Sequence, residues 1–192
     1  MKTAPFLLLA ASVAGCAAPR EAAGPQDAFF ERLAAHCGKA FEGRIASPAT
    51  EADSAFAGKR LVMHVRKCSA EEIRIPFHVG EDRSRTWVVS RRTVGLRLKH
   101  DHRHSDGSED KLTQYGGDTV AAGSAARQEF PADPFSKALF EREKIPASAA
   151  NVWAMEARDR IFAYELRRPG RFFRVEFDLG RPVPPPPAPW GG

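Results

Sequence analysis

Apolar and polar residues alternate with a period of two along most of this 192-residue chain. The clearest run is Ile73, Ile75, Phe77 and Val79, in which every second residue is apolar. This period places alternate side chains on opposite faces of an extended strand, so it predicts a mainly β protein. The expected strands span residues 41–45, 60–68, 72–79, 85–91, 94–102, 112–118, 126–130, 152–158, 161–167 and 171–179.

Short turns rich in Gly, Asp and Pro separate these segments, for example at residues 80–82 and 169–170. Strands joined by consecutive hairpins predict an antiparallel meander. Closing such a meander into a barrel removes its exposed edges, and eight to ten strands leave room for side chains or one small ligand. We therefore expect one β-barrel domain over residues 27–180, with a two-sheet β-sandwich as the alternative. The Pro-rich residues 181–192 are expected to form a mobile tail.

Two helices interrupt the β pattern. The first is expected over residues 28–37, where apolar residues recur at helical spacing behind Asp27 as the N-cap. The second is a short inserted helix, with Asp133 as the N-cap and Pro134 at the first helical position, and it ends before Pro146.

The N-terminus is typical of an export signal. Lys2 precedes an apolar stretch over residues 5–13, which is shorter than the roughly 20 residues needed to span a bilayer. The following Val13-Ala14-Gly15-Cys16 resembles the lipobox of bacterial lipoproteins. The resemblance implies removal of residues 1–15 and attachment of diacylglycerol and an acyl chain to Cys16. An ordinary signal peptide cleaved nearby is the alternative.

Residues 16–26 are then expected to be the lipidated cysteine and a flexible tether. Because Ala17, rather than Asp, follows Cys16, lipoprotein sorting implies the periplasmic face of the outer membrane rather than the inner membrane. The segment over residues 95–118 resembles uncharacterised bacterial envelope proteins, and the mature domain is similar to calycins only in architecture. Neither resemblance implies an activity.

The two remaining cysteines, Cys37 and Cys68, form an even pair in an oxidising compartment. We expect them to form a disulfide; two buried free thiols are the alternative.

Three histidines at alternate positions are the most unusual feature of the chain. His100, His102 and His104 share one strand face with Leu96 and Leu98, so we expect their rings to point at least partly inward. Neutral imidazoles at this spacing can share a divalent metal such as zinc. The other interpretations are a structural polar network or a ligand site.

Asp118 is the acidic residue expected on the partner strand of this histidine face. It is therefore grouped with the three histidines as a candidate ligand or polar site. The sequence predicts no catalytic residue and requires no cofactor.

The chain carries a formal charge of +5, and its arginines cluster near residues 83–97 and 167–174. We expect most of them to lie on solvated strand faces, and an exported protein is not expected to bind nucleic acid. The sequence thus favours a non-enzymatic, lipid-anchored envelope protein that binds a small hydrophobic ligand or an envelope protein, or has a structural role. The alternative is a metal-dependent or hydrolytic enzyme that uses the histidine face.

Overall fold

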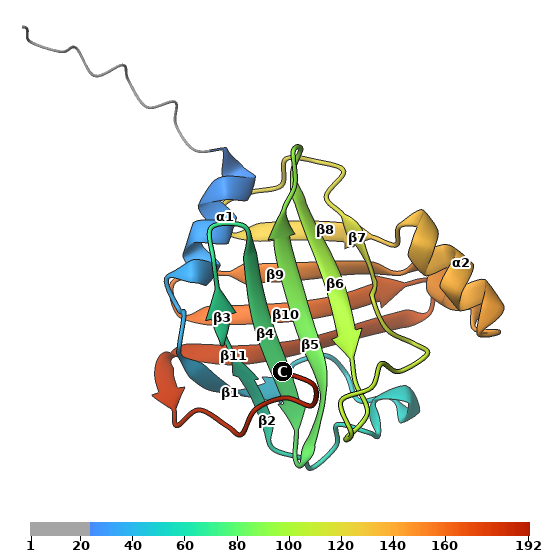
Figure 1. Ribbon diagram of the computed structural model, residues 1–192, viewed down its shortest axis with the longest axis horizontal. Helices are drawn as coiled ribbons and strands as arrows, with labels where there is room; N and C mark the ends of the chain where they lie inside the picture. The colour runs from blue at the N-terminus through green and yellow to red at the C-terminus, as the bar shows by residue number, and fades with distance from the viewer. Residues whose placement is uncertain (1–23) are drawn as a thin grey trace, which may run out of the picture.

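The alternating segments form one antiparallel sheet curled into a nearly closed barrel, with an N-terminal and an inserted α-helix (Figure 1). The structure is a computed structural model and describes residues 24–192. In Figure 1, strands β4 to β6 cross in front of strands β8 to β11. The strands are β1 Ala40–Ile45, β2 Leu61–His64, β3 Lys67–Cys68, β4 Glu72–Val79, β5 Asp82–Arg91, β6 Leu96–His102, β7 Tyr115–Asp118, β8 Arg127–Pro131, β9 Val152–Ala157, β10 Ile161–Arg168 and β11 Arg171–Val183.

The sheet order explains how the barrel closes. Ten strands follow the path β7-β6-β5-β4-β2-β1-β11-β10-β9-β8, and β3 pairs with β4 beside it. If β3 is left aside, neighbouring strands on this path follow one another in the chain, with one exception. The exception is the pairing of β11 with β1, which joins the two ends of the domain. All these strands belong to one sheet, which confirms the barrel and not the sandwich.

The two strands at the ends of the path, β7 and β8, meet at a seam. The amide of Gly116 donates a 2.7 Å hydrogen bond to the Ser136 hydroxyl, which donates in turn to the Gly116 carbonyl at 2.9 Å. The amide of Asp133 also donates to that carbonyl, at 2.9 Å. A Cβ atom on Gly117 would lie 1.8 Å from the carbonyl oxygen of Pro131. This glycine pair therefore lets the segment that leads into the second helix lie directly against β7.

The inserted helix α2, Pro134–Arg142, begins as predicted. The side chain of Asp133 accepts a 2.8 Å hydrogen bond from the amide of Ser136, and Pro134 is the first helical residue.

The N-terminal helix α1, Pro25–Ala34, begins and ends earlier than predicted. Pro25 opens it, because a helix does not need the missing amide at this position. Asp27 does not cap the helix but forms an ion pair with Arg91. The Arg91 guanidinium also lies 4.2 Å from the centre of the Phe30 ring. The helix buries Phe29, Phe30 and Leu33 against the barrel, so α1 closes one of its ends.

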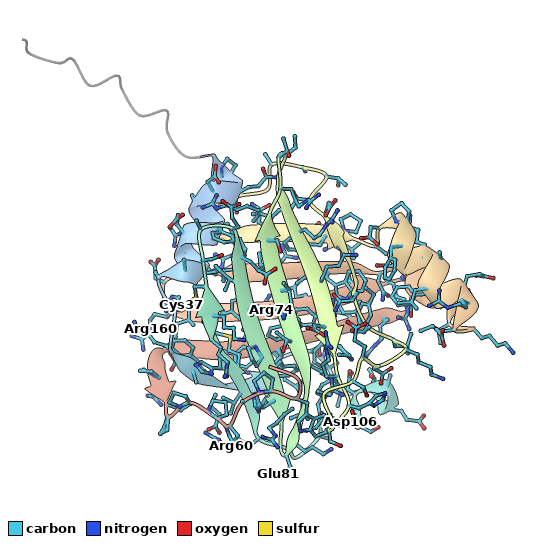
Figure 2. The ribbon with its side chains drawn as sticks, viewed as in Figure 1. Cys37, Arg60, Arg74, Glu81, Asp106 and Arg160 are labelled. Carbon is cyan, nitrogen blue, oxygen red and sulfur yellow. A yellow bond between two sulfur atoms is a disulfide. The ribbon has the colours of Figure 1, made fainter. Side chains whose placement is uncertain are left out.

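The predicted disulfide between Cys37 and Cys68 is confirmed. It joins the segment after α1 to β3, and the two Cα atoms lie 6.2 Å apart. Figure 2 shows Cys37 at the side of the barrel where α1 packs.

The fold extends beyond both predicted domain limits, 27 and 180. It begins with α1 at Pro25, and β11 continues to Val183 because that residue pairs with Ala40 of β1. The last residues then run across β4 and β5 (Figure 1). The amide of Trp190 donates a 3.1 Å hydrogen bond to the carbonyl of Arg83. The predicted mobility of residues 181–192 stays a prediction.

Two predicted strands differ most from expectation. The segment over residues 60–68 divides into β2 and β3, and the segment over residues 112–118 is extended only in β7. None of the helices within residues 24–192 combines the length and apolar character that a membrane crossing requires. Cys16 and its lipobox lie outside the described residues.

Candidate functional site

The barrel has a cavity of about 350 Å³ at the end opposite α1. It is bounded by the first half of β5, the end of β6, the loop after β6, the segment from α2 into the 3-10 helix η2 (Pro146–Ala150), and the turn from β10 into β11. Helix α1 instead meets the other ends of these strands: Gln26 donates a 2.9 Å hydrogen bond to Thr119, and Arg32 pairs with Asp159. In Figure 2, Asp106 of the loop after β6 lies across the barrel from Cys37.

Eight aromatic side chains line the cavity. The Trp87 ring stacks between Phe77 and Tyr164, at centroid distances of 4.8 and 4.5 Å. The Tyr115 and Trp153 rings lie 5.7 Å apart on another part of the wall. The aromatic lining residues are Phe56, Phe77, Trp87, Tyr115, Phe140, Trp153, Tyr164 and Phe173. Such a wall suits a largely apolar occupant, and the cavity volume falls within the range of small-molecule sites.

His100 belongs to the cavity floor and points inward, as predicted. It is 3% exposed, and its ring stacks on Tyr115 at 4.5 Å. Its Nδ1 donates a 3.1 Å hydrogen bond to the carbonyl of Tyr115, and its Nε2 accepts a 2.7 Å hydrogen bond from the hydroxyl of Tyr164. Burial, first of all, lowers the pKa of His100 to about 3, so this ring is neutral at physiological pH.

His102 lies beside His100, with ring centres 6.4 Å apart. Its Nε2 is hydrogen-bonded to the Tyr115 hydroxyl at 3.2 Å, and its backbone amide donates to the Thr113 hydroxyl at 2.8 Å. Burial lowers the pKa of His102 to about 4, with a smaller contribution from the charge of Arg85. The two histidines thus form a polar network with the tyrosines around them.

His104 does not join this network, contrary to the predicted three-histidine face. Strand β6 ends at His102, and beyond it Arg103 forms an isolated bridge with Glu109. The His104 side chain is 56% exposed, and its Nδ1 lies 4.0 Å from Asp110. The period-two argument does not apply beyond the end of the strand.

Asp118 also lies away from the two inward histidines. Its carboxylate accepts two hydrogen bonds from Arg97, at 2.6 and 2.8 Å, and this pairing lowers the pKa of Asp118.

The candidate metal set of three histidines is therefore not assembled. Both ring nitrogens of His100 already have hydrogen-bond partners, so it offers no free lone pair to a metal. Residues 24–192 contain no group of three or more His, Cys, Asp or Glu side chains arranged to hold a metal ion.

Three arginines lie around the cavity: Arg85, Arg168 and Arg171. Two of them are neutralised locally, because Arg85 pairs with Asp82 and Arg171 forms a two-bond ion pair with Asp53 at 2.6 and 2.8 Å. These arginines were expected on solvated faces. Arg167 does lie on a solvated face, because it pairs with Glu129 on the outside of the sheet.

Sequence reasoning missed most of the cavity outside β6. Its other walls come from η2 and from the β10–β11 turn, which are distant in sequence. One available signal was the alternation in β10 and β11, which places Tyr164 and Phe173 on the inner face. A scan against protein-family models, a search of curated proteins and a search of solved structures each found no match.

Proposed function

We propose that this protein is a lipid-anchored protein of the bacterial cell envelope that binds a small, mostly apolar ligand inside its barrel. The observation that carries the binding proposal is the aromatic cavity of about 350 Å³ at one end of the barrel. The lipid anchor rests on the lipobox at Val13-Ala14-Gly15-Cys16, and the periplasmic face of the outer membrane rests on Ala17.

The arrangement of the two barrel ends supports this combination. The proposed anchor enters the fold through α1, which closes one end with Phe29, Phe30 and Leu33. The cavity lies at the opposite ends of β5 and β6. A protein held to a membrane through its N-terminus would therefore keep the cavity away from the point of attachment.

The enzymatic alternative based on the histidine face has less support. His100 and His102 are the inward members of that face, and burial lowers the pKa values of both far below neutrality. An efficient general base has a pKa near the working pH. Two neutral histidines that are hydrogen-bonded to tyrosines suit a rigid cavity floor better than proton transfer.

The binding proposal can be tested with the uncharged fluorescent probe N-phenyl-1-naphthylamine. The protein is the proposed mature chain, residues 16–192, carrying Cys16→Ser, which lacks both the apolar signal segment and the proposed acyl acceptor and so allows work without detergent. We expect saturable binding with one probe per chain, seen as increased probe emission and as quenching of tryptophan emission, because Trp87 and Trp153 line the cavity.

A matched pair of variants in η2 locates the probe. Ser148 lines the cavity, whereas Ala147, next to it, is exposed and does not. Ser148→Trp places a large ring at the cavity wall and should weaken binding by about tenfold or more, about 1.4 kcal/mol. Ala147→Trp should leave binding unchanged. A probe that does not bind, or that binds all three proteins equally, contradicts the proposal.

A further inference from the structure

Arg168 is the arginine of the cavity whose charge is not neutralised by the protein. Its Nη1 donates hydrogen bonds to the Asn151 side-chain oxygen at 3.0 Å and to the Ser148 hydroxyl at 3.4 Å. Both partners are uncharged. Within residues 24–192, Arg168 has no carboxylate partner, and its Nε and Nη2 groups donate no hydrogen bond to the protein.

This environment differs from that of the many arginines on the outside of the sheet. Arg127, Arg167 and Arg174, for example, all pair with glutamates of β8, β9 or β10. An arginine presents its donors as a planar fork that matches the two oxygens of a carboxylate. The guanidinium group of Arg168 lies at the cavity, and two of its nitrogens, Nε and Nη2, donate no hydrogen bond to the protein.

Asp110 is the carboxylate among the cavity-lining residues, and it is occupied locally. One of its oxygens accepts a 2.8 Å hydrogen bond from the amide of Leu112, and the other lies 4.0 Å from His104. It forms no ion pair with Arg168. An anion bound at Arg168 therefore does not have to displace a protein carboxylate.

The shape of the wall limits the rest of the ligand. Trp87 stacks nearly parallel to Phe77 and Tyr164, with interplanar angles of 14° and 23°. His100 and Tyr115 are stacked with an angle of 16°. Aromatic side chains packed in this way attract an aromatic ligand ring, which gains edge-to-face or stacked contacts with them in addition to burial. The cavity volume is near the lower limit for ligand sites, which favours a compact molecule.

We propose that the ligand is a small planar aromatic compound bearing one carboxylate, with its ring among the cavity aromatics and its carboxylate on Arg168. This inference rests on the proposed function, because it names the chemical class of the molecule that the cavity binds.

The test compares two compounds that differ only at the polar group, 2-naphthoate and 2-naphthalenemethanol. Isothermal titration calorimetry at pH 7 uses the same protein, residues 16–192 carrying Cys16→Ser. We expect 2-naphthoate to bind at least tenfold more tightly than the alcohol, since hydrogen bonds between charged groups are the stronger ones. Decanoate, which has the carboxylate but a flexible chain, should bind more weakly than 2-naphthoate.

Variants of Arg168 assign the preference to this side chain. Arg168→Gln should weaken 2-naphthoate binding about tenfold and change alcohol binding by less than twofold, because the charge is lost and the apolar wall remains. Arg168→Lys should keep most of the preference. Arg181→Gln is the control, since that side chain is 85% exposed and does not line the cavity.

The possible failures can be distinguished. Equal binding of naphthoate and alcohol, or equal weakening of both by Arg168→Gln, overturns the assignment of a carboxylate to Arg168. Tighter binding of decanoate than of 2-naphthoate overturns the planar ring. Absence of binding by all three compounds and by N-phenyl-1-naphthylamine contradicts the proposed function itself.

Discussion

The Nε2 atom of His100 lies 2.7 Å from the hydroxyl of Tyr164, and this hydrogen bond connects β6 to β10 across the inside of the barrel. The two residues are 64 positions apart in the chain. The His100 ring accepts this bond while its Nδ1 donates to Tyr115, so the pair requires the neutral imidazole. The polar floor of the cavity thus depends on the protonation state of one buried histidine.

We predict that His100 makes the protein less stable as the pH falls below about 6.5. The unfolded chain binds a proton near that pH, whereas burial holds the folded pKa of His100 at about 3. Between these values the unfolded state carries the extra proton. The contribution of His100 therefore lowers the free energy of unfolding by about 1.4 kcal/mol for each unit by which the pH falls. Above pH 6.5 it contributes no pH dependence.

Urea denaturation at pH 7, 6 and 5 measures this slope. His100→Asn removes the titrating group, so its free energy of unfolding should fall less steeply between pH 6 and 5 than that of the parent protein. Equal slopes in the parent and in His100→Asn would show that His100 is not held neutral.

The sequence predicts the barrel well where apolar residues alternate regularly along a strand. The run from Ile73 to Val79 gives β4 with its observed limits, because its apolar residues face the core. Prediction from the sequence fails where contacts between distant segments decide where a strand ends. β11 extends to Val183 because it pairs with β1, a contact between distant segments that local alternation does not report.

The histidine face, too, was predicted correctly in part, as far as the regular strand extends. Leu96 and Leu98 correctly place His100 and His102 inside, but the strand ends before His104. Asp118 could have been excluded from the sequence: it lies an odd number of positions from Tyr115, so an inward Tyr115 puts Asp118 on the opposite face. Arg168 could not have been found, since its role depends on Asn151, 17 residues earlier.

We predict that the seam between β7 and β8 does not tolerate a side chain at Gly117. Gly117→Ala should lower the free energy of unfolding by about 3 kcal/mol, because the new Cβ atom would overlap the backbone of Pro131. Gly58→Ala is the control: its φ is +67° and nothing lies within 4 Å, so only backbone strain of about 1 kcal/mol is expected. Similar losses for the two variants, measured by urea denaturation, would contradict the close packing of this seam.

The disulfide is predicted to contribute substantially to stability. It closes a segment with a sequence separation of 31 residues, and it ties the chain after α1 to β3. Replacing Cys37 and Cys68 together by Ala should lower the free energy of unfolding by about 2–5 kcal/mol. The same double variant should be insensitive to a reducing agent, whereas the parent should be destabilised by it. A parent protein whose unfolding is unchanged by reduction would argue against this role.

Lipidation is predicted at Cys16. Cells grown with an alkyne-bearing palmitate should yield labelled parent protein in the membrane fraction, and Cys16→Ser should abolish the label. The Cys37→Ala and Cys68→Ala double variant should be labelled like the parent. Equal labelling of the Cys16→Ser protein would refute the lipobox interpretation.

The central claim is that a ligand enters the barrel at the end opposite α1, and methyl NMR tests it within one molecule. Leu112 and Leu166 line the cavity, whereas Val94 and Val120 are 84% and 81% exposed near the helical end. When N-phenyl-1-naphthylamine is added to the Cys16→Ser protein, we predict that the methyl signals of Leu112 and Leu166 shift saturably and that those of Val94 and Val120 do not. Shifts at Val94 and Val120 without shifts at Leu112 and Leu166 would contradict the account.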